Sequence, residues 1–138
     1  MKALRLTVFG LVVASLLLAA CGGGGGQSSG QPTISAEAEK FASLKGDATA
    51  GKAKFEGTCA ACHGPDAKGL PGLGKDLTTS TFAKGLPDAE LILFVTKGRD
   101  PSDPLNTTGV QMPPRGGNPA LTDQDLADVI AYVRTLEK

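Results

Sequence analysis

Three residues of this 138-residue chain have the types and spacing of a chemical site: Cys59, Cys62 and His63 in the run Cys-Ala-Ala-Cys-His. Two thiols separated by two residues and followed at once by an imidazole are typical of covalent haem attachment. Each thiol can bond one haem vinyl group as a thioether, and the imidazole then binds the iron from one side. The motif predicts one haem c per chain, bonded through Cys59 and Cys62 and ligated by His63.

Two other uses of this motif agree less well with the surrounding sequence. A redox disulfide usually follows a strand in a βαβ unit, whereas residues 47–58 have a helical pattern. A structural zinc site needs four ligands, and the predicted folded part of the chain has no Cys or His beyond Cys59, Cys62 and His63. Haem attachment therefore remains the favoured interpretation.

A sixth iron ligand is expected because low-spin haem for electron transfer is usually ligated by a second His, a Met or, less often, a Lys. His63 is the only histidine, and Met1 begins a segment that we expect to be removed on export. Met112 is then the only thioether, in a stretch, 99–120, that carries five prolines. An isolated methionine is more often core filler, but beside a haem motif we predict that Met112 is the second axial ligand.

This ligand pair has a chemical consequence. A thioether is a soft donor that favours ferrous iron, so one His and one Met should raise the reduction potential compared with two imidazoles. Six strong ligands also close the iron to small molecules. The expected activity is one-electron transfer, and we expect no enzymatic function.

The N-terminus has the organisation of an export signal. Lys2 and Arg5 precede an uncharged run, 6–20, whose 15 residues are fewer than the roughly 20 that span a bilayer. The run ends in Leu-Ala-Ala-Cys and resembles the lipobox of bacterial lipoproteins. This resemblance implies removal of residues 1–20 and lipidation of Cys21 with acyl chains such as palmitate. The alternative is an ordinary signal peptide with Cys21 as a free thiol.

Residues 21–35 are predicted to form a flexible tether, because five consecutive glycines are followed by Gln, Ser and Gly and little apolar surface is available for folding. Removing residues 1–20 takes two of the 14 basic residues and no acid, which leaves 12 against 14. With no basic stripe and no aromatic-rich face, the chain is not expected to bind nucleic acid. The lipoprotein resemblance implies export and anchoring to a bacterial membrane on its periplasmic or extracytoplasmic side.

Helical patterns with capping signals predict an all-α domain over 47–138. The predicted helical stretches are 36–46 (a short helix or a linker), 47–58, 87–97 and 122–136. Asp47 is a candidate N-cap, Pro87 a helix start, and Thr122 with Asp125 a capping box. Long loops are expected at 64–81, with leucines 70, 73 and 77 facing inward, and at 99–120.

From Asp47 to Leu136 the chain resembles a class I c-type cytochrome. Gly51 and Phe55 precede Cys59 at four-residue steps, and Val129 and Tyr132 occupy the matching positions near the C-terminus. The resemblance implies a small all-α fold of three to five helices around one covalent haem. It also implies that the N-terminal and C-terminal helices cross at Gly51, with the Tyr132 ring filling the gap.

The family's Gly-Pro-x-Leu segment, whose proline carbonyl accepts a hydrogen bond from the proximal histidine, is here Gly74, Lys75, Asp76 and Leu77. We expect the Lys75 carbonyl to replace the proline carbonyl. Three lysines at positions 54, 68 and 75 are also candidates for a charged docking patch around the haem edge.

The resemblance implies one-electron transfer by a lipid-anchored monohaem cytochrome in a respiratory or photosynthetic chain, between partners such as a quinol-oxidising complex and a terminal oxidase. A second interpretation is a fixed subunit of a membrane oxidoreductase such as alternative complex III. A third is an open-site haem enzyme or gas sensor, which requires a labile sixth iron position.

Overall fold

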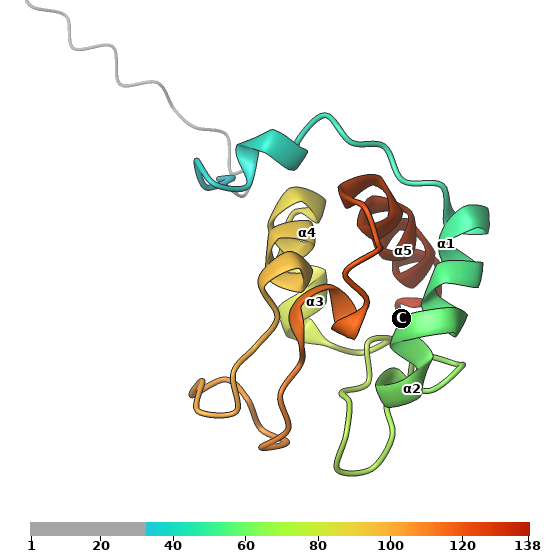
Figure 1. The fold of residues 1–138 in the computed structure, drawn as a ribbon, viewed down its shortest axis with the longest axis vertical. Coiled ribbons are helices and arrows are strands. Elements are labelled where there is room, and N and C mark those ends of the chain that lie inside the picture. The colour runs from blue at the N-terminus through green and yellow to red at the C-terminus, as the bar shows by residue number, and fades with distance from the viewer. Residues whose placement is uncertain (1–32) are drawn as a thin grey trace, which may run out of the picture. The chain divides into compact units, whose positions relative to one another are not determined.

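The computed structural model describes residues 33–138 (Figure 1). Over this range the chain is helical and contains no β-strand, and its one extended pairing is an isolated bridge between Arg99 and Met112. The predicted all-α fold class is therefore confirmed.

Several predictions concern the N-terminal residues. The signal peptide 1–20, the lipidated Cys21 and most of the tether 21–35 lie outside the described residues. Among the residues that are described, no helix is both long and apolar enough to cross a membrane.

The helical stretch that begins at Ala48 runs without a break to His63. It consists of α1 (Ala48–Lys54), a turn of π-helix (Phe55–Cys59) and α2 (Ala60–His63). The predicted N-cap Asp47 is confirmed, because its carboxylate accepts hydrogen bonds from two backbone N–H groups of the first turn at 2.7 and 3.2 Å. One helical stretch thus ends on the Cys-x-x-Cys-His motif.

Two helices follow the first long loop. The short α3 (Thr81–Gly85) is capped by Ser80 and was not expected from the sequence. α4 (Asp88–Lys97) begins after Pro87 and ends at Gly98, as predicted. Four of its residues, Ala89, Leu91, Ile92 and Leu93, are buried.

α5 (Asp123–Leu136) begins with the predicted capping box. The Thr122 hydroxyl accepts from the Asp125 N–H at 3.1 Å, and the Asp125 carboxylate accepts from the Thr122 N–H at 2.7 Å. Hydrogen bonds from the Thr122 hydroxyl and N–H and from Lys54 lower the pKa of Asp125 to about 2. The carboxylate is therefore ionised at neutral pH and holds the helix start.

α1 and α5 cross at Gly51, as the family resemblance implies (Figure 1). A Cβ at Gly51 would lie 1.9 Å from the Asp128 carbonyl oxygen, so the two helix backbones are in contact there. The rings of Phe55 and Tyr132 pack beside the crossing with centroids 5.5 Å apart. A residue larger than glycine does not fit at this position.

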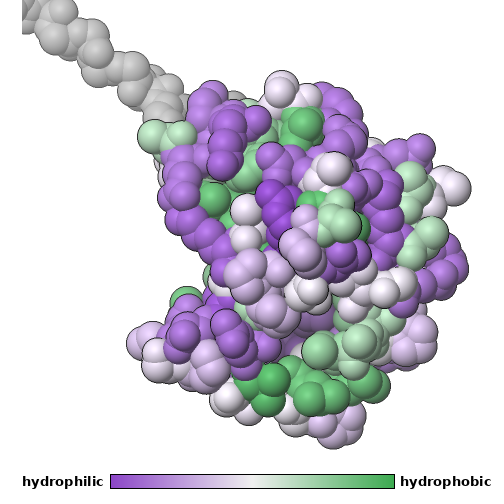
Figure 2. All heavy atoms as spheres, in the orientation of Figure 1, coloured by the Kyte–Doolittle hydropathy of each residue, from purple (hydrophilic) through white to green (hydrophobic). Residues whose placement is uncertain are grey.

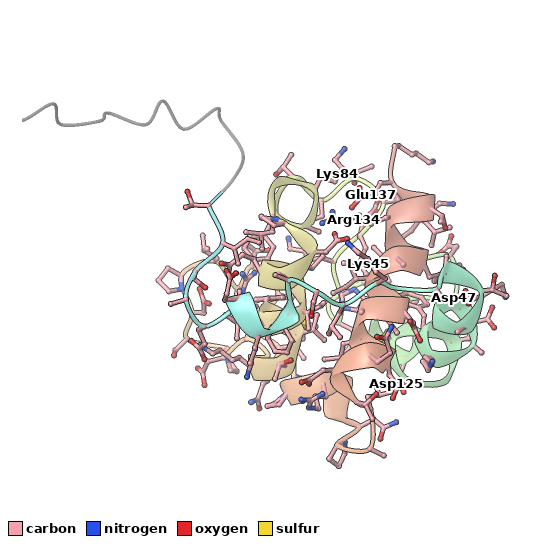
Figure 3. The ribbon with its side chains drawn as sticks, turned by 90° about the horizontal axis from the view of Figure 1, so that it is seen from above. Lys45, Asp47, Lys84, Asp125, Arg134 and Glu137 are labelled. Atoms are coloured by element: carbon pink, nitrogen blue, oxygen red, sulfur yellow. The ribbon has the colours of Figure 1, made fainter. Side chains whose placement is uncertain are left out.

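A buried carboxylate joins the same two helices. Asp128 is 5 % exposed, and its carboxylate accepts from the Lys54 ammonium at 2.8 Å, the Asp47 N–H at 3.0 Å and the Gln124 amide at 2.8 Å. Burial alone acts to raise the pKa of Asp128, but these hydrogen bonds outweigh it and the pKa is lowered. Gln124 also donates to the Lys45 carbonyl at 2.7 Å, where the chain passes over α5 into α1 (Figure 3).

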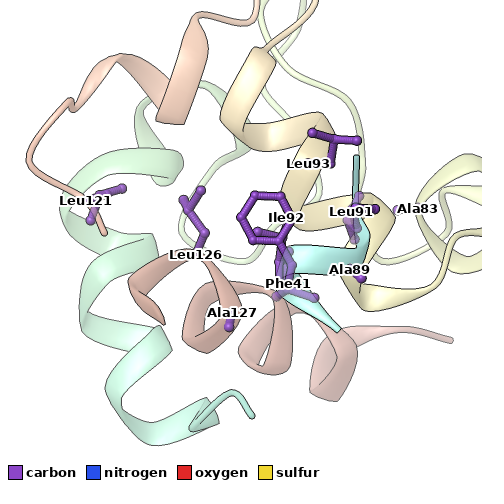
Figure 4. Packing of buried hydrophobic residues seen from close by; sticks show 11 residues of the cluster. Phe41, Ala83, Ala89, Leu91, Ile92, Leu93, Leu121, Leu126 and Ala127 are labelled. Carbon is purple, nitrogen blue, oxygen red and sulfur yellow. The ribbon is translucent and has the colours of Figure 1, made fainter. Parts of the chain in front are cut away.

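Residues 36–46, predicted as a short helix or a linker, form a 3-10 turn (Glu39–Phe41) that packs on the domain. The Phe41 ring is buried in one cluster with Ile92 of α4 and Leu126 of α5 (Figure 4). Glu37 forms an ion pair with Lys97 at the end of α4 at 2.5 Å. This segment therefore contributes to the core.

Replacing Gly51 with alanine tests the helix crossing. We expect Gly51→Ala to lower the free energy of unfolding by about 3 kcal/mol, the upper end of overpacking costs, because the added Cβ meets backbone atoms that cannot rotate away. The matched control is Gly57→Ala, since no heavy atom lies within 4 Å of a Cβ at Gly57. There we expect no loss, or a gain of up to about 1 kcal/mol. Urea unfolding followed by far-UV circular dichroism measures both, and equal effects would contradict the crossing.

Candidate functional site

A cavity of about 500 Å³ opens between the end of α2, the two long loops, and the inner faces of α4 and α5. Cofactor sites usually have volumes of roughly 300–1,000 Å³ and mostly apolar walls. The wall residues supplied by α4 and α5 are apolar: Leu91, Phe94, Val95, Val129, Ile130 and Val133. The cavity fits a large apolar cofactor.

All four residues that the sequence predicts for the site line this cavity. Cys59, Cys62 and His63 come from the π-turn and α2, and Met112 comes from the loop between α4 and α5. Met112 lies 49 or more positions after the other three residues, so two separate segments of the chain share one cavity. A cofactor held from two sides requires such an arrangement.

The two thiols are not paired in a disulfide, and both are partly buried. Burial, with a smaller effect from Cys62, raises the pKa of the Cys59 thiol to about 11. Redox-active cysteines act as thiolates with lowered pKa values. Residues 33–138 also contain no group of three or more His, Cys, Asp or Glu side chains placed to hold a metal ion. The redox-disulfide and zinc interpretations gain no support here.

The ring of His63 is oriented by a backbone carbonyl. Its Nδ1 lies 2.8 Å from the Lys75 oxygen, which confirms that Lys75 takes the place of the family's proline. When Nδ1–H donates to this carbonyl, Nε2 keeps a lone pair for an iron. Gly74 makes the approach possible, because a Cβ there would lie 2.3 Å from the Cys62 carbonyl oxygen.

Met112 is fixed to the end of α4. Its backbone accepts from the Arg99 N–H at 2.8 Å and donates to the Arg99 carbonyl at 3.0 Å, so the two segments run antiparallel. Gly98, with φ of 74°, lies directly beneath this pairing, because a Cβ there would be 2.3 Å from the Met112 carbonyl oxygen. Two backbone hydrogen bonds and one close glycine contact thus hold the methionine segment.

The Arg99 side chain adds a second attachment that sequence reasoning missed. Its guanidinium carbon lies 4.5 Å from the Phe82 ring centroid and 4.6 Å from that of Phe94. Nη1 donates to the Leu105 carbonyl at 3.3 Å, and Nε lies 3.4 Å from the Asp103 carboxylate. Cation–π packing of this kind contributes about 0.5–2 kcal/mol. These contacts follow no helical or strand period, so the sequence pattern did not identify them.

The other side of the Met112 segment is held by a turn of 3-10 helix (Pro114–Gly117). Arg115 has a φ of 53°, uncommon for a residue with a Cβ, and its guanidinium donates to the Leu121 carbonyl at 2.8 Å and to Asp123 at 2.6 Å. A Cβ on Gly116 would lie 3.1 Å from a methyl of Thr58. The turn 114–117 therefore packs between the π-turn and the start of α5.

One prediction about the first long loop is wrong. Leu70 was expected to face inward but is 37 % exposed and does not line the cavity, whereas Leu73 lines the cavity as expected. Leu77 packs against the buried Phe55 cluster as expected. The loop is held by backbone hydrogen bonds, including Leu70 N–H to Cys62 O at 3.0 Å, rather than by leucine burial.

The three lysines considered for a docking patch differ in their charged neighbours. Lys54 lies 2.8 Å from Asp128 and 3.0 Å from Asp125. Lys68 lies 3.1 Å from Asp66. Within the described part of the chain, only Lys75 of the three lysines has no ion-pair partner.

Comparison with known proteins agrees with this site. The family model for cytochrome c matches residues 48–137. Cytochrome c-555 of Chlorobaculum thiosulfatiphilum is 36 % identical over 88 residues, which cover 63 % of this chain and 93 % of that protein. Cytochrome c-554(548) of Halomonas halodenitrificans is 35 % identical over 92 residues, which cover 67 % and 99 %.

A relative of a different kind is the CcoP subunit of the cbb3-type cytochrome c oxidase of Rhodobacter capsulatus. It is 32 % identical over 111 residues, which cover 80 % of this chain but 33 % of that subunit. No solved structure matches the chain significantly.

Replacing Gly98 with alanine tests the attachment of the Met112 segment. Gly98 and Gly109 both have positive φ, 74° and 70°, but a Cβ meets the Met112 carbonyl only at Gly98, and no heavy atom lies within 4 Å at Gly109. We expect Gly109→Ala to cost about 1–2 kcal/mol of unfolding free energy from its backbone conformation. Gly98→Ala should cost at least about 1 kcal/mol more, from the added clash. Equal losses in urea unfolding would contradict the close approach.

Proposed function

This chain belongs to the cytochrome c family, and from this membership we propose which residues hold its haem and where the protein works. As a c-type cytochrome it carries covalently bound haem c and serves electron transfer. When bound, the haem supplies an iron that cycles between Fe(II) and Fe(III).

Cys59 and Cys62 are the proposed thioether residues, and His63 is the proposed proximal ligand. The observation that carries this assignment is the 2.8 Å hydrogen bond between His63 Nδ1 and the Lys75 carbonyl, which leaves Nε2 for the iron.

Met112 is the proposed sixth ligand. It lines the same cavity as His63, and it is held there by Arg99 and by the turn that follows it. Bound to the iron, its thioether would favour the reduced state and would occupy the position that a substrate or gas would need. A non-enzymatic role as an electron carrier follows from this closed coordination.

The proposed setting is a bacterial membrane, on its periplasmic or extracytoplasmic side, with the mature chain anchored by lipid at Cys21. The apolar run before Cys21 and the glycine-rich residues after it support this setting. Tethering raises the effective concentration of the domain near membrane partners. We propose that those partners are a quinol-oxidising complex and a terminal oxidase of a respiratory or photosynthetic chain.

A second candidate is a fixed subunit of a membrane complex. Its support is the likeness to CcoP, which by name is a subunit of an oxidase. The two candidates share the same haem chemistry and differ in whether the protein is permanently bound to other subunits. After solubilisation in a mild detergent, a free carrier elutes with haem absorbance at the size of one small domain, whereas a subunit elutes with its partners.

Substituting Met112 tests the axial ligand. We expect Met112→Ala to lose the sulfur-to-iron charge-transfer absorption, to bind added imidazole readily in the ferric state, and to have a reduction potential lower by on the order of 0.1 V, within the ~0.8 V that axial ligands span. Met112→His is the control, because it should lower the potential and still exclude imidazole. An unchanged spectrum in Met112→Ala would show that Met112 does not coordinate the iron, and would favour the open-site enzyme or sensor.

Substituting Cys21 tests the anchor. In the native host, the Cys21→Ser protein should move from the membrane fraction to the soluble fraction and lose the mass of the acyl chains, while its haem spectrum stays unchanged. The spectrum is the control for folding of the domain. If the wild-type protein carries no acyl mass that the substituted protein lacks, the lipid proposal is wrong. Sedimentation of the substituted protein with membranes would instead indicate an uncleaved signal segment or a protein partner.

A further inference from the structure

The chain segment before α1 packs on α4 and α5. It covers residues 33–46, and we call it the strap. The strap lies before residue 48, where the match to the cytochrome c family model begins. In Figure 1 it lies beside α4 at one end of the molecule, and none of its residues lines the cavity. Any effect of the strap on the haem site must therefore pass through a helix.

Apolar side chains hold the strap on the domain. Phe41 is 2 % exposed and Ala38 is fully buried, in one cluster with Ile92 of α4 and Leu126 of α5. Figure 2 shows mostly hydrophilic residues on this face of the upper part of the molecule, where the strap lies. The strap thus buries its apolar side chains and leaves its polar ones in water. Burial of the Phe41 ring is the main force that keeps the strap in place.

Polar contacts attach the strap to both ends of α4. The Ser35 N–H donates to the Glu90 carboxylate in the first turn of the helix. Glu37 pairs with Lys97 in its last turn. Glu90 and Lys97 are seven residues apart, so they lie on one face of α4. Phe94 lines the cavity from another face. α4 therefore lies between the strap and the cavity.

The end of α4 also carries the methionine segment. Met112 is hydrogen-bonded through its backbone to Arg99, which lies two residues after Lys97. α4 contacts the turn 114–117 that follows Met112, and it contacts the turn 39–41 of the strap. One helix therefore joins the strap to the chain on both sides of Met112.

We propose that the strap positions the sixth iron ligand, because it holds α4 and α4 holds Met112. This inference rests on the proposed function, in which Met112 binds the iron, and adds the part of the chain that keeps the sulfur in place. Phe41 is the positioning residue, since it has the largest buried side chain of the strap. When the strap is displaced, α4 is freer to move and the sulfur leaves the iron more often.

Imidazole binding to the ferric protein measures how often the site is open, because imidazole reaches the iron only after Met112 leaves it. The experiment uses the full haem-loaded protein. We expect Phe41→Ala to raise the second-order rate of imidazole binding about tenfold, through loss of a large buried side chain. Phe41→Leu keeps most of the apolar volume and should stay within about threefold of the wild-type rate.

The matched control removes an aromatic ring elsewhere. Tyr132 packs on Phe55 beside the helix crossing, in a different cluster from Phe41 and outside the cavity wall. Tyr132→Ala and Phe41→Ala should both unfold at a lower urea concentration than the wild type. Tyr132→Ala should change the imidazole rate less than about twofold. Equal increases in the two variants would mean general destabilisation and would overturn the positioning role.

Charge reversal tests the strap without opening a cavity in the core. Glu37→Lys places like charges together at the end of α4 and should raise the imidazole rate about threefold. Adding Lys97→Glu restores an ion pair and should return the rate to that of the wild type.

The wild-type spectrum separates failure of the positioning role from failure of the proposed function. If the wild type has the sulfur-to-iron charge-transfer absorption and neither Phe41→Ala nor Glu37→Lys raises the imidazole rate, the strap does not position Met112. A wild-type ferric protein that lacks this absorption and binds imidazole readily would overturn Met112 as the ligand.

Discussion

The backbone contact between Gly51 and the Asp128 carbonyl is the constraint on which the rest of the structure depends. It sets the distance between α1 and α5, and Asp128 then turns its carboxylate to Lys54, Gln124 and the N–H of Asp47. Since α1 continues through the π-turn into α2, the crossing also fixes where Cys59 and His63 meet the inner face of α5. Packing of two helices therefore places one half of the haem site.

The cofactor of this family forms part of the core. The buried residues fall into two clusters, one around Phe41, Ile92 and Leu126 and one around Phe55, Val129 and Val133, and the cavity of about 500 Å³ borders both. Without the haem, the apolar walls of this open cavity would face water, which disfavours the folded state. Haem binding and folding of this chain are therefore expected to be strongly coupled.

Local signals in the sequence predicted what is local in the structure. Asp47, Pro87, Gly98 and the Thr122–Asp125 box mark helix ends because the hydrogen bonds involved span only a few residues. The crossing at Gly51 and the Lys75 carbonyl came from the family resemblance, since neither follows from periodicity.

The missed features lack a periodic signal in the sequence. α3 has five residues and one cap, too little for a periodic signal. The position of Arg99 over Phe82 and the pairing of Lys54 with Asp128 depend on partners that the fold brings together. A count of lysines near a motif cannot show which of them already have a carboxylate partner.

The two sides of the proposed haem site are held in different ways, and this difference has a consequence for how the site opens. Cys59, Cys62 and His63 belong to one helical stretch and would be bonded to the cofactor, so this side cannot separate from it. Met112 depends on two backbone hydrogen bonds to Arg99 and on the turn stabilised by Arg115. Segments with few buried apolar contacts open at a lower free energy than the core. Local opening of this domain should therefore begin at the methionine segment.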